Sequence, residues 1–355
     1  MPTGYNQSEQ TIGNQIGTNT IHHNLADLLP STSEIGHLWT VYQAESMSIC
    51  FLKKWTNETT DPDIRLIIQE ALDISTQRVK AMDNLLDSIN YPKPYGFGEK
   101  DVNLDAPALF SQSFFCLYMR MTHKMVMHHY VSAITSAYRP DFREFYSQCL
   151  LTSDDIHRKA TALLMVKGLL QRHPSIVPPN SFPAVADKKY FGSYFFKHKR
   201  PLNAVEISHI YSLIEIKRLI RTLNIGLCQV VKSDKIKSYL LRAKEIADKQ
   251  LATLSELLTN EEIPSPVISE FLITDAREPG FSDKLILTHA TAITAYVTSA
   301  YGLAMPNMFR KDLDIIMAKY IAELLGLARD GAQLLTDYGW FERVPETPDR
   351  YKLIH

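Results

Sequence analysis

Two Glu-x-x-His pairs have the residue types and spacing most suited to chemistry: Glu34 with His37, and Glu206 with His209. Such pairs on helices supply ligands to dinuclear iron or manganese centres, which need four carboxylates and two imidazoles that converge from four helices. Glu34, however, follows Ser31 by three residues at the start of a predicted helix, and an Asn precedes the second pair in the same way. This spacing is a capping-box signature. We therefore interpret both glutamates as helix caps rather than as metal ligands.

A mid-helix carboxylate, Glu45, is the more informative candidate. It lies on the apolar face of the first predicted helix, between Tyr42 and Ile49, where an unpaired charge is costly and a partner is required. His128 and His157 lie beside the apolar faces of two later helices. Glu45, His128 and His157 together define an alternative hypothesis, a reduced site that holds a single transition metal as its cofactor.

The chain repeats itself. Many identities appear when residue n is compared with residue n+172 up to a loop near residue 100, and with residue n+171 after that loop. They include Glu34 and Glu206, Pro92 and Pro264, Tyr130 and Tyr301, and Gly168 and Gly339. One single-residue gap relates the two halves over their whole length, so the chain is a tandem duplication.

The second copy does not retain the candidate metal ligands. In order, Glu45, His128 and His157 correspond to Lys217, Ser299 and Ala328. Because a dinuclear centre needs its full set of ligands, we expect none in either copy, and we assign no catalytic or cofactor-binding residue. Hydrogen bonds with other buried polar groups are the expected role of these side chains.

Each copy is predicted to be a bundle of four helices. In the first copy they cover about 34–58, 62–90, 109–138 and 140–168, as indicated by apolar periodicity and by Pro and Gly at the ends. Short links make the first and second helices, and the third and fourth, antiparallel neighbours. The link at 91–108 is long enough to return along the bundle. A single long crossover is typical of ferritin-like folds, so the predicted fold class is all-α, a tandem duplication of two ferritin-like four-helix bundles.

The predicted domain organisation follows from these boundaries. It comprises a disordered polar tail at 1–24, a first bundle at 25–173, a linker at 174–202, a second bundle at 203–345 and a C-terminal tail at 346–355. The linker is rich in Pro and aromatic residues, unlike a flexible polar spacer, so we expect it to lie against both bundles and join them. An extensive apolar interface between the copies would make the chain a built-in pseudo-dimer.

Composition disfavours several classes of partner. With 38 basic and 39 acidic residues, the chain has no net field to attract a nucleic acid or an anionic membrane. No stretch reaches the roughly 20 apolar residues that span a bilayer. The first 24 residues lack the basic start and apolar run of a signal peptide, so we expect cytoplasmic synthesis, with protein partners or self-association.

The four cysteines form no close CxxC pair and are expected to be reduced core thiols.

Several segments resemble an uncharacterised family of tandem ferritin-like proteins from spore-forming bacilli, some members of which carry a spore-coat label. The segments are Glu34 to Trp39, Gly96 to Pro107, Lys199 to His209, Phe281 to Leu285, Asp330 to Ala332 and Gly339-Trp340. The resemblance covers about residues 25–350 and implies the fold and an association with the spore, but it supplies no catalytic residues.

Two hypotheses of function follow from these observations. The first is a non-enzymatic structural or interaction protein that is associated with the spore, as a coat protein is. The alternative is a ferritin-like metal-binding protein or oxidoreductase that uses the reduced site in the first bundle.

Overall fold

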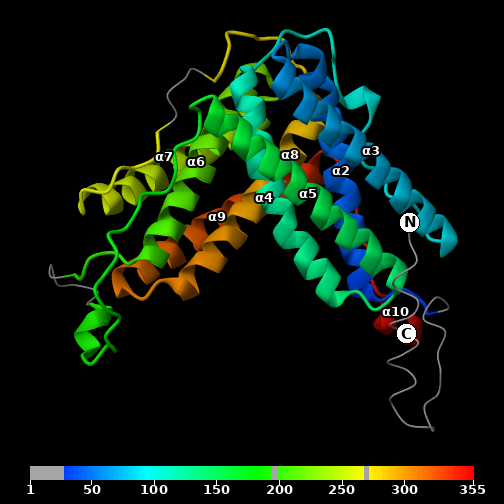
Figure 1. The fold of residues 1–355 in the computed structure, drawn as a ribbon. Helices are drawn as coiled ribbons and strands as arrows, with labels where there is room; N and C mark the ends of the chain where they lie inside the picture. Colours follow the sequence, from blue (N-terminus) through cyan, green and yellow to red (C-terminus); the bar gives the residue numbers. More distant parts are fainter. Residues whose placement is uncertain (1–27, 193–198, 268–271) are drawn as a thin grey trace, which may run out of the picture.

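The computed structural model describes residues 28–192, 199–267 and 272–355 and is built from helices (Figure 1). The first repeat contains α2 (Thr32–Glu58), α3 (Pro62–Ser88), α4 (Gln112–Ser136) and α5 (Pro140–Val166). The second contains α6 (Ala204–Val230), α7 (Asp234–Thr259), α8 (Asp283–Ala304) and α9 (Lys311–Asp337). Short helical turns are η2 (Glu99–Asp101), η3 (Lys188–Phe191), η4 (Met305–Asn307) and α10 (Arg350–Ile354). The predicted fold class is confirmed: each repeat is a helical bundle with one long crossover between its second and third helices.

The predicted helix caps are confirmed and have a second role. Ser31 and Glu34 form a reciprocal capping box at the start of α2. Glu34 Oε1 also accepts hydrogen bonds from the backbone N–H groups of Tyr138 and Arg139, at 2.8 and 2.7 Å. The same contacts recur in the second repeat, where Glu206 caps α6 and accepts from the corner between α8 and α9. Each glutamate therefore fixes its first helix to the turn that joins the last two.

The two bundles diverge from a shared apex at which the crossover segments meet (Figure 1). There the two segments pair antiparallel through backbone hydrogen bonds. Asn103 N–H donates to Gly280 O at 2.8 Å, and Thr274 N–H donates to Leu109 O at 3.0 Å. Thr274 is the counterpart of Asn103 in the second repeat, and Leu109 is the counterpart of Gly280 in the first, so the second hydrogen bond repeats the first with the two repeats exchanged. This reciprocity is the isologous pattern of a two-fold axis, here contained within one chain.

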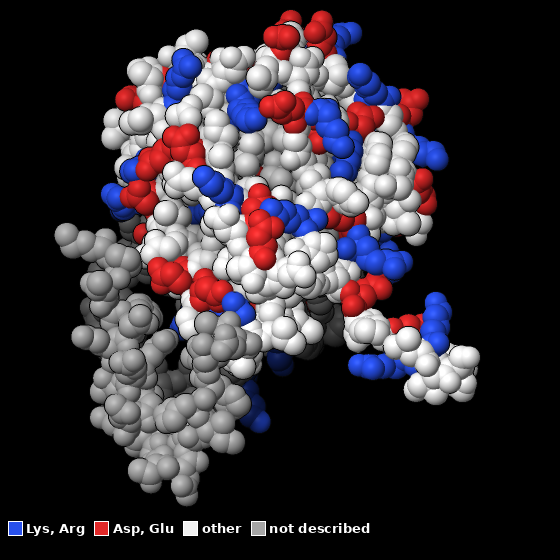
Figure 2. All heavy atoms as spheres, turned by 90° about the vertical axis from the view of Figure 1, so that its right-hand side faces the viewer, with Lys and Arg blue, Asp and Glu red and all other residues white. Residues whose placement is uncertain are grey.

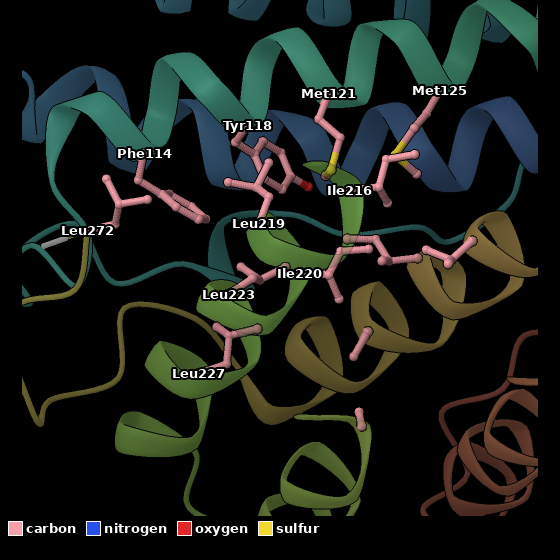
Figure 3. Packing of buried hydrophobic residues seen from close by; sticks show 14 of the residues in the cluster. Phe114, Tyr118, Met121, Met125, Ile216, Leu219, Ile220, Leu223, Leu227 and Leu272 are labelled. Atoms are coloured by element: carbon pink, nitrogen blue, oxygen red, sulfur yellow. The ribbon is translucent and has the colours of Figure 1, made fainter. Parts of the chain in front are cut away.

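Apolar side chains continue the contact between the repeats. On α4, Phe114, Tyr118, Met121 and Met125 face Ile216, Leu219, Ile220 and Leu223 of α6 (Figure 3). Phe281 of the second repeat lies against Phe51 of α2, with ring centroids 4.4 Å apart. The equivalent residue, Phe110, lies so close to Gly226 of α6 that a Cβ there would be 2.4 Å from its ring. One buried apolar cluster therefore extends through both repeats.

The linker does not join the bundles in the way that its aromatic residues suggested. Residues 175–189 are exposed, and Phe182 is 91% exposed; Tyr194, Phe195 and Phe196 lie outside the described residues. The expectation that the linker covers the interface is wrong for this segment, because aromatic content does not say where a chain runs.

Segments directly after the fourth helices make the cross-connections instead. After α5, Gln171 Oε1 accepts from Val267 N–H of the second repeat at 2.9 Å. After α9, Glu342 Oε1 accepts from Tyr95 N–H of the first repeat at 2.8 Å. Gln171 and Glu342 are equivalent, as are Val267 and Tyr95. The chain after each bundle thus binds the crossover of the other.

The surface carries both signs of charge. Figure 2 shows Lys and Arg interspersed with Asp and Glu on the face it presents, without a large area of one sign. Among the described residues, no helix has the length and apolar character to cross a membrane. The four cysteines are buried and free.

Candidate functional site

The middle of the first bundle is occupied by a buried ion pair between Glu45 of α2 and Arg78 of α3. Arg78 Nη1 donates to Glu45 Oε1 at 2.7 Å and to the Tyr130 hydroxyl at 3.1 Å. The Tyr130 hydroxyl donates to the same carboxylate oxygen at 2.8 Å. Glu45 and Arg78 are only 4% and 6% exposed. The partner that Glu45 required on the apolar face of its helix is therefore a guanidinium.

The other terminal nitrogen of Arg78 binds α5. The two hydrogens of Nη2 are shared among three acceptors, Cys149 O at 2.8 Å, Thr152 Oγ1 at 2.6 Å and Ser153 Oγ at 2.8 Å. With Glu45 on α2 and Tyr130 on α4, this one side chain contacts all of the other three helices. A planar guanidinium with several donors suits such a convergence.

The ion pair stays charged despite its burial. Burial raises the pKa of Glu45, but the charge of Arg78 and hydrogen bonds from Ser75, Arg78 and Tyr130 outweigh it, so the pKa lies below its ordinary value. Burial lowers the pKa of Arg78, but the charge of Glu45, the nearby Tyr130 and Cys149 and the hydrogen bond with Glu45 together more than reverse this, so the pKa lies above its ordinary value. Burial and the Glu45 charge raise the pKa of the Tyr130 hydroxyl, which remains a neutral donor.

This polar centre divides the core of the first bundle. Towards the outer end of the bundle, a separate apolar cluster contains Leu38, Val41, Met82, Leu86, Tyr130, Ala133, Ala137, Phe142, Tyr146 and Cys149. Towards the apex, the apolar side chains belong to the cluster that extends into the second repeat. The ion pair is thus the polar link between two apolar layers.

The second bundle has a related centre with the charges rearranged. Lys217 takes the place of Glu45, and its Nζ lies 5.4 Å from the centre of the Tyr301 ring. The Tyr301 hydroxyl donates to Gln250 Oε1 at 3.2 Å, and Gln250 Nε2 donates to Glu323 Oε2 at 3.2 Å. Burial lowers the pKa of Lys217 to about 7, although the charge of Glu323 opposes this. Gln250, Tyr301 and Glu323 are the counterparts of Arg78, Tyr130 and Thr152, so the polar centre recurs while its charges do not.

The three residues of the alternative metal hypothesis do not come together. Glu45 is engaged by Arg78. His128 is exposed, and its Nδ1 lies 2.9 Å from Lys124 O on its own helix. His157 is half-buried on α5, and burial, followed by the charges of Arg120 and Lys124, lowers its pKa. Within residues 28–192, 199–267 and 272–355, no three His, Cys, Asp or Glu side chains are grouped as metal ligands.

Sequence reasoning missed Arg78, although a signal for it was present. Arg78 stands on the stripe of α3 that also carries Ala71, Ser75, Met82 and Leu86 at three- and four-residue spacing. A buried carboxylate such as Glu45 requires a partner, and an arginine on a buried helix stripe is a residue that can provide one.

A family model for DUF3231, described as a protein of unknown function, matches residues 25–182 and again residues 190–353. The chain belongs to the DUF3231 family. A solved structure described as a candidate spore coat protein from Bacillus halodurans is similar to part of the chain, with 21% sequence identity and a TM-score of 0.41. The match covers 44% of this chain and 100% of that one. No curated protein sequence matches significantly. The two family matches agree with the internal duplication of this DUF3231 protein.

Proposed function

We propose that this DUF3231 protein is a non-enzymatic structural or interaction protein. The observation that carries this proposal is the closure of the first bundle's centre by Arg78. In a bundle that holds a metal, inward carboxylates from several helices surround a cation. Here the guanidinium is the cation, and it is bound to the chain, so the carboxylate and hydroxyl groups that surround it are already satisfied.

The setting that we propose is the bacterial spore, with synthesis in the cytoplasm and a coat-like role. The support for this is the resemblance of the segments at 34–39, 96–107 and 199–209 to the family of the spore-forming bacilli. A pseudo-dimer with a mixed-charge surface suits a role in protein assembly better than one in binding a polyanion.

Elemental analysis of the purified full-length chain tests the non-metal part of the proposal. After dialysis against a chelator-free buffer, we expect no stoichiometric iron, manganese or zinc. We also expect the same metal content in His157→Ala as in the wild type. Two or more transition-metal ions per chain would overturn the proposal. One retained ion that is lost in Glu45→Gln, His128→Ala or His157→Ala would favour the metal-binding alternative instead.

A further inference from the structure

A cavity of about 220 Å³ lies where α2 and α4 of the first bundle meet α8 of the second. Most of its wall is apolar, with contributions from Met47, Phe51, Trp55, Met119, Met125 and Ile293. Exposed residues at its margin, Thr40 on α2 and Ala292 on α8, place its opening at the surface between the two repeats. Glu45, Arg78 and Tyr130 of the polar centre form part of its lining.

Two buried histidines in the lining have ring nitrogens without partners. His123 and His289 are 7% and 6% exposed, and among the described residues neither Nδ1 has a hydrogen-bond partner. The other nitrogen of His289 is bound to the Tyr118 hydroxyl, its counterpart in the first repeat. A buried polar atom that lacks a partner is costly, and such atoms in native structures usually have one that the protein itself does not supply.

The charges of the lining define the ligand's charge. Burial lowers the pKa values of His123 and His289 to about 3, so both rings are neutral at physiological pH. Arg78 is the nearby cation, and Glu45 neutralises it at 2.7 Å. A charged ligand would therefore be buried without a counter-ion, which is unfavourable.

The volume defines the ligand's size. An apolar cavity of about 150 Å³ is known to hold benzene, so this one has room for a substituted or two-ring aromatic molecule. A mainly apolar wall with a few polar atoms is the usual composition of a small-molecule site.

We propose that this cavity binds a neutral, compact aromatic molecule that carries one hydroxyl group. The rings contact the methionine and aromatic side chains, and the hydroxyl reaches the imidazole of His123 in the lining. A hydroxyl both donates and accepts, so it can bind either tautomer of a neutral imidazole.

The duplication makes the site single. The counterpart of His123 in the second repeat is Thr294, whose hydroxyl already donates to Ala290 O at 2.8 Å. The counterparts of Phe51 and Met47 are Leu223 and Leu219, which are buried in the interface of Figure 3. We therefore expect one ligand per chain.

Equilibrium dialysis of the full-length protein against 2-naphthol and against naphthalene tests the proposal. The two probes share a ring system and differ by the hydroxyl. We expect one equivalent of 2-naphthol to bind three- to tenfold more tightly than naphthalene, about the effect of one net hydrogen bond. Absence of saturable binding, or equal affinity for the two probes, would overturn the proposal.

Two substitutions locate the binding. Ala292→Trp places an indole at the opening and should weaken the binding of both probes at least tenfold; Ala295→Trp, also exposed on α8 but outside the lining, should bind as the wild type does. His123→Phe should retain naphthalene and lose the preference for 2-naphthol. Equal effects of the two tryptophans, or a preference that survives in His123→Phe, would contradict the assignment. The exposed Ala292 position keeps the test valid if His123→Phe fails to fold.

Discussion

Replacement of Arg78 by Met tests the polar centre most sharply. The substitution keeps a long side chain but removes the donors that bind Glu45, Tyr130, Cys149 O, Thr152 and Ser153. The Glu45 carboxylate then remains buried without its counter-ion. Removing one partner of a buried ion pair typically costs about 3–5 kcal/mol. Because whole domains are stable by about 5–15 kcal/mol, we expect Arg78→Met to fold but to be much less stable.

The matched control removes both charges. In Glu45→Leu/Arg78→Met no carboxylate is left buried without a partner, so the double variant should be more stable than Arg78→Met alone. We expect a coupling free energy of about 2–3 kcal/mol from urea unfolding followed by circular dichroism. A loss below about 1 kcal/mol in Arg78→Met, or equal losses in the single and double variants, would refute the assigned role.

The slope of stability against pH is a second test of the polar centre, because it should have opposite signs in the wild type and in Arg78→Met. In the wild type the pKa of Glu45 is lower in the folded state than in the unfolded state. Its contribution to stability is therefore present above the unfolded pKa and is lost as the pH falls through the folded pKa. Without Arg78, we expect burial to outweigh the remaining hydrogen bonds from Ser75 and Tyr130 and to raise the pKa of Glu45, so Arg78→Met should become more stable as the pH falls from 7 towards 5. An unchanged sign of this slope would contradict the explanation.

Three further changes test other parts of the structure. Gly226→Ala places a Cβ 2.4 Å from the buried Phe110 ring and should lower the free energy of unfolding in urea by about 1–3 kcal/mol. Its control, Gly302→Ala, has open space around it and should raise that free energy by about 0.5–1 kcal/mol. Similar effects of the two substitutions would exclude the close contact. Glu342→Ala removes the acceptor for Tyr95 N–H, Gly96 N–H and Gln43 Nε2 and should lower the free energy of unfolding by about 1–3 kcal/mol. Its control, Glu346→Ala at an exposed position, should leave that free energy unchanged. Equal losses in the two variants would contradict the cross-connection. The pKa of Lys217 is about 7 in the folded state, below its unfolded value, so the free energy of unfolding should rise by about 1.4 kcal/mol per pH unit as the pH rises above 7. Lys217→Met should flatten this slope. An unaltered slope would show that the pH dependence does not come from Lys217.

The local features of the fold could be predicted because their causes are local. The capping box of Ser31 and Glu34, the proline at the start of α3 and the apolar periodicity each depend on residues within a few positions. The duplication was also visible, because the two copies retain enough identical residues to be aligned. Fold class and helix order followed from these signals.

The contacts between distant segments could not be predicted in the same way. The sequence showed that Glu45 needs a partner, but the choice of Arg78 depends on how α3 is rotated within the bundle. The pairing of the crossover segments at Asn103 and Gly280 depends on the relative position of the two bundles. The aromatic linker was assigned to the interface by composition alone, and the exposed Phe182 shows that composition does not determine position.

Calorimetry of the intact chain and of its separate halves tests most directly whether the two repeats form one body through their reciprocal contacts. The shared apolar cluster and the exchanged hydrogen bonds of Gln171 and Glu342 predict a single cooperative transition for the chain. Separate halves should be poorly soluble or should re-associate when mixed, because each would expose the face that the other covers. Two independent, reversible transitions that match those of soluble, well-behaved halves would contradict the account.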